Sequence, residues 1–256
     1  MLRFSLLGSG SSGNAMLVRS ASGKILVDCG LSLKQLVLRT AAIGESIEDL
    51  DAVFITHEHG DHVLGLGTLA RRFNVPVYMT EGTHAALPDS VGKLPNVIHF
   101  EAGETVAVDG LALTSFSVSH DAADPVSFVI NSGGVQLGLA TDLGHAPAMV
   151  KRRLEGSHAL VLESNYCHEL MRQSPYPAAV RQRIMGSQGH LSNSEMNSLL
   201  DELLHEALRL VVLVHISQEN NREDLAHRMA ARVLEGHAAR LVVASRERPT
   251  ELFCVV

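Results

Sequence analysis

The chain has 256 residues, a length that one compact domain of strands and helices can reach, so we expect a single domain over residues 1–256. Hydrophobic residues make up 46% and charged residues 19%, as in an ordinary globular protein with a substantial core. The formal net charge of −7 argues against general electrostatic binding to nucleic acid or membrane, although bound divalent cations can reverse the sign of a local site.

Nothing in the sequence predicts export or insertion into a membrane. Residues 1–13 lack the apolar stretch of a signal peptide, and no apolar run approaches the ~20 residues needed to cross a bilayer. The three cysteines, Cys29, Cys167 and Cys254, are odd in number, lie far apart and form no CxxC motif. We therefore expect a reduced, cytoplasmic protein with no membrane partner.

The first half of the chain is predicted to form short strands joined by Gly/Ser-rich turns. Strands are expected at residues 3–7, 14–19, 24–28, 52–56, 77–79, 97–100, 104–108, 111–117, 127–130 and 135–140, and helices at 33–42 and 66–73. In the second half, helices at 147–154, 178–185, 193–208 and 222–234 alternate with strands at 159–163, 210–214, 241–243 and 252–255. Strands with helices on their outer faces predict an α/β fold of two packed sheets.

The densest group of potential metal ligands follows the strand expected at 52–56 and reads THEHGDH over residues 56–62. His57 and His59 point to the same side of an extended chain, because strand side chains alternate. Gly60 permits a sharp turn, so that Asp61 and His62 come from a second limb at the start of a helix. Imidazole and carboxylate ligands suit Zn²⁺, Mn²⁺ or Fe²⁺ better than Ca²⁺ or Mg²⁺.

Three other predicted strands each end in one coordinating side chain followed by a polar turn. These side chains are His120 after residues 111–117, Asp142 after 135–140 and His215 after 210–214. Taken singly, a His or Asp at a strand end is commonly a capping or turn residue. Together with the cluster at 57–62, the three predict one metal site.

The HxHxDH signature at 57–62 is matched without a gap, and with the later His, Asp and His the chain resembles the metallo-β-lactamase superfamily. The resemblance implies an αβ/βα sandwich of two mixed sheets with helices on the outer faces. It implies two divalent metal ions, Zn²⁺ or Mn²⁺ with Fe²⁺ as a further option. The implied ligands are His57, His59 and His120 for one ion and Asp61, His62 and His215 for the other, with Asp142 bridging.

Further motifs are similar to the YycJ/WalJ branch of this superfamily, which is associated with 5′-to-3′ exonuclease activity on DNA. They are GSGSSGN at residues 8–14, ESN at 163–165, PYP at 175–177, GHLSN at 189–193 and HISQENN at 215–221. One departure is Tyr166, which stands directly after ESN where the branch has a histidine. The likeness covers nearly the whole chain.

Two metals about 3.5–4 Å apart lower the pKa of a bridging water and stabilise both the attacking and the leaving oxygen of a displacement reaction. The resemblance implies that Asp61 orients a metal-bridging hydroxide for attack on a phosphodiester. It also implies a histidine outside the metal set that contacts phosphate or protonates the leaving oxygen. We assign this role to His190 in the GHLSN turn, the alternative being that His190 only precedes a helix.

Substrate-binding residues are expected in the loops beside the cluster. The glycines at 8–14 let the backbone approach another group closely, so Ser11, Ser12 and Asn14 are candidates to hold a phosphate. Asn165 and Asn220, in the motifs at 163–165 and 215–221, are further candidates.

Two functions on this fold stay open: a nuclease acting on DNA (or RNA) ends, and a small-molecule hydrolase for cyclic phosphodiesters, lactones or thioesters. A concave basic surface leading to the metals would favour the nuclease, and a closed pocket sized for a metabolite would favour the alternative. Arg172, Arg181 and Arg183 are candidate phosphate contacts, although helical arginines more often form a solvated face. A non-catalytic, metal-stabilised module is disfavoured because no expected ligand is missing.

Overall fold

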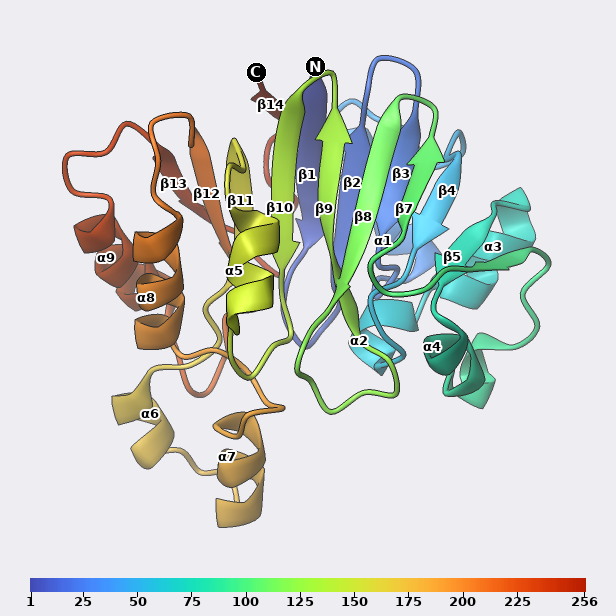
Figure 1. Cartoon of the computed structure of the whole chain (residues 1–256). Coiled ribbons are helices and arrows are strands. Elements are labelled where there is room, and N and C mark those ends of the chain that lie inside the picture. The colour runs from blue at the N-terminus through green and yellow to red at the C-terminus, as the bar shows by residue number, and fades with distance from the viewer.

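The computed structural model describes all 256 residues and contains two seven-stranded sheets packed face to face (Figure 1). The first sheet has the order β14 (Phe253–Val255), β1 (Leu2–Gly8), β2 (Ala15–Arg19), β3 (Lys24–Val27), β4 (Ala52–Phe54), β5 (Val77–Met79), β6 (Val97–His99). The second has the order β13 (Arg240–Val243), β12 (Leu210–Val214), β11 (Ala159–Glu163), β10 (Val135–Ala140), β9 (Val126–Ser132), β8 (Leu111–Ser117), β7 (Thr105–Val108). The predicted sandwich of two mixed sheets is confirmed.

Each sheet is antiparallel on one side and parallel on the other. Strands β3 to β6 are parallel in the first sheet, and strands β10 to β13 are parallel in the second. Parallel strands covered on both faces are apolar throughout, and all five residues of β12, LVVLV, are buried. Because parallel strands of one sheet end at the same edge, the loops after β10, β11 and β12 lie together.

Helices cover the outer faces of both sheets (Figure 1). Their bounds are α1 (Leu33–Ala42), α2 (Gly60–Val63), α3 (Leu66–Phe73), α4 (Glu81–Ala85), α5 (Ala148–Leu154), α6 (His168–Arg172), α7 (Ala178–Ile184), α8 (Asn193–Leu203) and α9 (Glu223–Val233), with a 3₁₀ turn at Asp89–Val91. Helices α6 and α7 project from the layers, and no residue of α7 is buried. No helix combines the length and the apolar character needed to cross a membrane.

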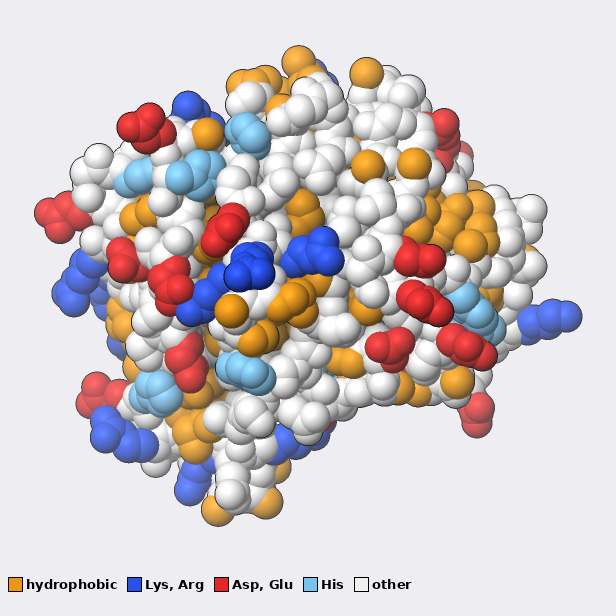
Figure 2. Space-filling view, viewed as in Figure 1, with side chains coloured by type: hydrophobic (Ala, Val, Ile, Leu, Met, Phe, Trp, Pro, Cys, Tyr) orange, Lys and Arg blue, Asp and Glu red, His pale blue; other side chains and the backbone are white.

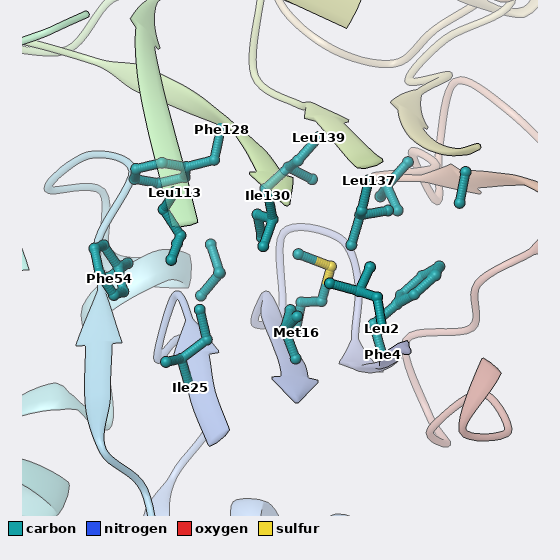
Figure 3. Packing of buried hydrophobic residues seen from close by; sticks show 14 of the residues in the cluster. Leu2, Phe4, Met16, Ile25, Phe54, Leu113, Phe128, Ile130, Leu137 and Leu139 are labelled. Atoms are coloured by element: carbon teal, nitrogen blue, oxygen red, sulfur yellow. The ribbon is translucent and has the colours of Figure 1, made fainter. Parts of the chain in front are cut away.

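The largest buried cluster, of 25 hydrophobic residues, lies between the two sheets, and Figure 3 shows part of it. Phe54 of β4 stacks on Tyr78 at a centroid distance of 4.7 Å and meets the edge of Phe128 from β9 at 5.8 Å. This edge-to-face pair joins the two sheets in the arrangement that aromatic rings prefer. Two further clusters, of 21 and 19 residues, pack the outer helices onto the second and the first sheet.

One predicted helix is too long. The capping box at Ser192 and Glu195 begins α8 as expected, but the helix ends at Leu203 and not at residue 208. Leu204 already has an extended backbone (ψ 130°), and the ring of His205 hydrogen-bonds to the Ser157 carbonyl and to the backbone N–H of Ala207. These tertiary and local hydrogen bonds replace the helical ones over the last turn. The single-turn helices α4 and α6 were not predicted, because five residues carry too little periodicity.

Candidate metal centre

Polar side chains from both sheets converge at one edge of the sandwich. His57 follows β4 of the first sheet, and His120, Asp142 and His215 follow β8, β10 and β12 of the second. The short helix α2 begins at Gly60, directly after His59, so that Asp61 and His62 come from a helical second limb as expected. Gly60 is not among the residues with a positive φ, so this turn does not depend on glycine. The structure thus brings together all seven side chains that the sequence predicts as metal ligands.

Three of the strand-end residues have a left-handed backbone. The φ angles are 61° at Asp28, 54° at Asp142 and 56° at His215, and none of these residues is glycine. Such conformations cost roughly 1–3 kcal/mol each and persist where the surrounding structure holds them. Here the turn at each strand end places a buried carboxylate or imidazole within the site.

The first donor group consists of three imidazoles. His57 Nε2 lies 3.1 Å from His59 Nδ1, which lies 3.3 Å from His120 Nε2. Ligand atoms around a tetrahedral Zn²⁺ at about 2.0–2.1 Å are separated by about 3.3 Å, so the observed spacing fits an ion held by these three nitrogens. Three histidines and one open position are a frequent catalytic set.

Hydrogen bonds determine which nitrogen of each ring faces the centre. Thr56 Oγ1 lies 3.0 Å from both oxygens of Asp28, so its hydroxyl donates to that carboxylate and accepts from His57 Nδ1 at 3.0 Å. His120 Nδ1 donates to the Gly189 carbonyl at 3.0 Å, and His62 Nδ1 donates to Asp28 at 2.8 Å. In each of these rings the other nitrogen, Nε2, faces the donor group, which is the orientation that metal binding requires.

The second donor group combines a carboxylate with two imidazoles. Asp61 Oδ2 lies 3.5 Å from His62 Nε2 and 3.5 Å from His215 Nε2. Asp142 Oδ2 lies 3.4 Å from the same nitrogen of His62, and Asp142 and His62 also form a donor set with His57 of the first group. Asp142 therefore lies between the two groups, where a bridging carboxylate would be.

The electrostatics differ between the two groups. Burial lowers the pKa of His57 and of His120, so these rings are neutral and able to coordinate. Burial also disfavours charge on His62, but Asp28 and Asp142 outweigh it and raise its pKa to about 9. The carboxylates around the second group make a negative field that suits a divalent cation.

Two buried carboxylates of the site were not predicted as functional residues. Asp28 accepts from His62 as described, and Glu163 at the end of β11 is fully buried. Glu163 Oε1 accepts from His190 Nδ1 at 2.7 Å and from His215 Nδ1 at 3.0 Å, and its other oxygen accepts two backbone N–H groups. The sequence does contain a signal for Glu163: it is the one carboxylate at the end of an otherwise apolar strand, ALVLE, and a buried charge of this kind needs partners.

His190 belongs to neither of these two triads, although it forms a further candidate donor set with Asp142, Glu163 and His215. Its ring centroid is 5.1 Å from those of His120 and His215, and its side chain is 20% exposed. Since Glu163 takes Nδ1, the other ring nitrogen remains for a ligand. The His190 ring lines a cavity of about 230 Å³. Asp61 and two residues of α7, Val180 and Ile184, line the same cavity.

The predicted substrate-binding residues have different surroundings. Ser11 lines this cavity, whereas Ser12 is exposed and does not line it. Asn14 Nδ2 donates to Asp61 at 3.0 Å, and Asn165 Nδ2 donates to the His215 carbonyl at 2.9 Å. Both amides therefore hold residues that are candidate metal ligands in position. Asn220 is fully buried, and neither polar atom of its side chain has a hydrogen-bond partner.

Tyr166, the departure noted in the sequence, is buried and does not line this cavity. Its ring packs edge-on against His168 at a centroid distance of 5.2 Å. Burial raises the pKa of the Tyr166 hydroxyl to about 12, so it stays protonated.

Two mixed sheets with outer helices, and histidine and aspartate ligands gathered at one edge of the sandwich, define a metal-dependent hydrolase of the metallo-β-lactamase fold. Residues 24–216 match the model of the β-lactamase superfamily domain, and the chain belongs to this superfamily. The structure is similar to that of the metallo-β-lactamase fold protein YhfI from Bacillus subtilis, with a TM-score of 0.75, 18% identity and coverage of 98% of this chain and 100% of that one.

Two relatives are similar along most of their length. Exodeoxyribonuclease YycJ of Bacillus anthracis is 35% identical over 236 residues, which cover 91% of this chain and 89% of the relative. Exodeoxyribonuclease WalJ of Streptococcus pneumoniae is 36% identical over 229 residues, covering 88% and 85%. The predicted resemblance to the YycJ/WalJ branch is confirmed.

Proposed function

We propose that this hydrolase is a dinuclear, metal-dependent 5′-to-3′ exonuclease that cleaves phosphodiester bonds at DNA ends. The observation that carries the proposal is its similarity to two relatives named exodeoxyribonucleases, over 91% and 88% of the chain. The two donor groups and the adjoining His190 support phosphodiester chemistry in particular. The bound ions, Zn²⁺ or Mn²⁺, would acidify a water molecule and neutralise the charge of the phosphate.

Asp61 orients the attacking water. Its carboxylate lines the cavity and its side chain is 23% exposed, so one edge of it is open to a ligand. Burial opposes ionisation, but the hydrogen bond from His215 and the charge of His62 outweigh it and lower the pKa of Asp61. The carboxylate therefore accepts a hydrogen bond from the water throughout the neutral pH range.

His190 supplies a proton to the leaving oxygen. The 2.7 Å hydrogen bond from its Nδ1 to buried Glu163 holds the ring in place, and the second nitrogen is left to donate. Burial lowers the pKa of His190, but the Glu163 carboxylate outweighs it, and the net shift is upward. A raised pKa keeps the imidazole in the acid form that this step needs.

The test is turnover of the Mn²⁺- or Zn²⁺-loaded protein on end-labelled duplex DNA carrying a 5′-phosphate or a 5′-hydroxyl. We expect stepwise release of nucleotides from the 5′ end, and none from an Asp61→Ala variant. His190→Ala should retain its metal and lose turnover by about 10²–10⁴-fold. The control is His227→Ala, which removes an exposed histidine of α9.

Failure of the metal-loaded protein to cleave DNA, together with hydrolysis of a cyclic phosphodiester, lactone or thioester, would overturn the nuclease assignment. Loss of metal from His190→Ala would instead overturn the role given to that residue.

A further inference from the structure

The cavity at the metal centre has an apolar surface as well as candidate ligands. Of the 12 residues that line it, only two are hydrophobic, Val180 and Ile184. Both belong to α7, and residues four apart on a helix lie on the same face. One face of α7 therefore gives the cavity a surface that suits an apolar part of a ligand and not its phosphate.

The packing of the fold does not account for these two side chains. No residue of α7 is buried, and Val180 is 39% exposed. Neither Val180 nor Ile184 belongs to, or packs against, any of the three hydrophobic clusters. Hydrophobic side chains are visible on the surface of the projecting α6–α7 segment in Figure 2. A single exposed hydrophobic residue is ordinary, but two on one helical face that line the cavity of a metal centre indicate a ligand.

Helix α7 is held against two loops of the metal centre. The backbone N–H of His190 donates to the Ile184 carbonyl at 2.9 Å. The hydroxyl of Ser119, in the loop after β8, donates to the Ser187 carbonyl at 2.8 Å. Gly189 permits the close approach, since a Cβ there would lie 2.1 Å from the Ile184 carbonyl oxygen. The apolar face of α7 therefore has a fixed position relative to the candidate ligands.

The arginines predicted from the sequence as phosphate contacts have other partners or another place. Arg181 donates to two carbonyls of the turn at 174–176, directly before α7. Arg183 lines the cavity at the metal centre, but it forms an ion pair with Asp121. Arg172 lines a different cavity, which contains none of the candidate metal ligands. What α7 offers to a ligand at the metal centre is therefore chiefly apolar.

The size of the cavity fits a single unit of a chain. Its volume of about 230 Å³ lies below the ~300–1,000 Å³ of pockets that enclose a drug-sized ligand. A nucleotide joins a phosphate, which the metal ions would neutralise, to a base with two apolar faces. Aliphatic side chains can pack against those faces whichever base is present, because they do not read its hydrogen-bonding edge.

We propose that Val180 and Ile184 pack against the base of the 5′-terminal nucleotide and so position the adjoining phosphodiester bond at the metal centre. This inference rests on the proposed nuclease function and names the part of the substrate that α7 recognises. It makes the contact independent of sequence, as an enzyme that removes successive nucleotides requires.

The experiment compares two DNA duplexes, each with a short 5′ overhang and a label at the 3′ end of the same strand. One carries an ordinary base at the 5′-terminal position, and the other carries an abasic tetrahydrofuran residue there. Because this position is unpaired, loss of the base does not alter base pairing. For the Mn²⁺-loaded parent chain, we expect removal of the base to lower kcat/KM for release of the first nucleotide by about tenfold.

The variant Val180→Ser/Ile184→Ser should lose this preference, so that its kcat/KM values for the two duplexes are nearly equal. Val180→Ile/Ile184→Leu keeps the apolar surface and should keep the preference. In the parent chain the ratio of the two values should not change with salt concentration, because an apolar contact releases no counterions.

Met185→Ser is the matched control. Met185 directly follows α7, is 44% exposed and does not line the cavity, so its replacement should leave the preference for a base as in the parent. Metal content and Tm, measured for every variant, should equal those of the parent and show that the serine variants are folded.

The outcomes distinguish the base contact from the function. Equal cleavage of the two duplexes by the parent, or an undiminished preference in the double serine variant, would overturn the contact even if the chain degrades DNA. An equal loss of turnover on both duplexes would make the two residues supports of the site and overturn the contact as well. No cleavage of either duplex by the parent, together with turnover of a thioester or lactone that depends on Val180 and Ile184, would replace the base by an acyl group and overturn both proposals.

Discussion

At the scale of single residues, two buried carboxylates determine how the imidazoles are presented. Asp28 accepts a hydrogen bond from His62, and Glu163 accepts one from each of His190 and His215. Such partners set the tautomer and the direction of a ligand, and their loss typically costs 10–100-fold in metal affinity or activity.

The first prediction concerns Asp28. In Asp28→Asn the neutral amide holds His62 Nδ1–H more weakly, so we expect metal affinity to fall by about 10–100-fold. Competition with a chromogenic chelator measures this. Asp201→Asn, an exposed position of α8, is the control. Equal affinities for the parent and the Asp28 variant would show that His62 needs no carboxylate partner.

The second prediction concerns Glu163. In Glu163→Gln a single amide oxygen replaces a charged acceptor shared by two imidazoles, so kcat on DNA should fall by about 100-fold or more. Metal content, measured by atomic emission, should fall less, because His215 keeps its other neighbours. Glu169→Gln, an exposed carboxylate of α6, should behave as the parent. Equal loss of metal and turnover would make Glu163 a support of the metal centre alone.

At the scale of the element, the 57–62 segment depends on close backbone packing. A Cβ on Gly30 would lie 1.7 Å from the carbonyl oxygen of Asp61 and 2.6 Å from the backbone nitrogen of Asn14. Those two atoms are themselves joined by a 2.7 Å hydrogen bond. The glycine after β3 is therefore what lets the ligand-bearing loop approach the first sheet.

Gly30→Ala and Gly60→Ala form a matched pair. We expect Gly30→Ala to displace Asp61, abolish metal binding and reduce the free energy of unfolding by about 1–3 kcal/mol. A Cβ on Gly60 meets nothing within 4 Å, so Gly60→Ala should stay within about 0.5 kcal/mol of the parent. Urea denaturation and metal titration measure both. Similar behaviour of the two variants would refute the packing argument.

Predicted elements were accurate where the signal is local. The bounds of α1, α3, β8, β10, β11 and β12 agree with those predicted, because hydrophobic periodicity and flanking turns lie within each segment. The start of α8 agrees for the same reason, since a capping box is a local contact. Its end does not, because His205 is drawn into contacts with residues far away in the chain.

At the scale of the whole molecule, the candidate ligands join the two sheets. His57, His59, Asp61 and His62 belong to the segment after β4, whereas His120, Asp142 and His215 follow strands of the other sheet. A bound ion would therefore cross-link the sandwich at its edge, in addition to the apolar core between the sheets. We propose that residues 1–256 unfold as one domain for this reason.

Removal of metal should lower stability. At a free metal concentration of 100 times Kd, binding adds about 2.7 kcal/mol, which corresponds to roughly 5–10 °C in Tm for a chain of this size. Calorimetry of the metal-loaded and chelator-treated protein should show one transition that moves by this amount. A His57→Ala variant should show a much smaller shift. An unchanged Tm, or two separate transitions, would contradict the cross-link or the single domain.

The sequence by itself determined the ligand types, their places at strand ends and the two-sheet class of the fold. These are properties of local spacing: a run of four donors in six residues, and apolar strands that each end in one polar group. Only the tertiary structure decided which buried groups hold the candidate ligands in place. Asp28 and Glu163 come from distant parts of the chain, and a buried hydrogen bond exists only once folding has brought its two partners together.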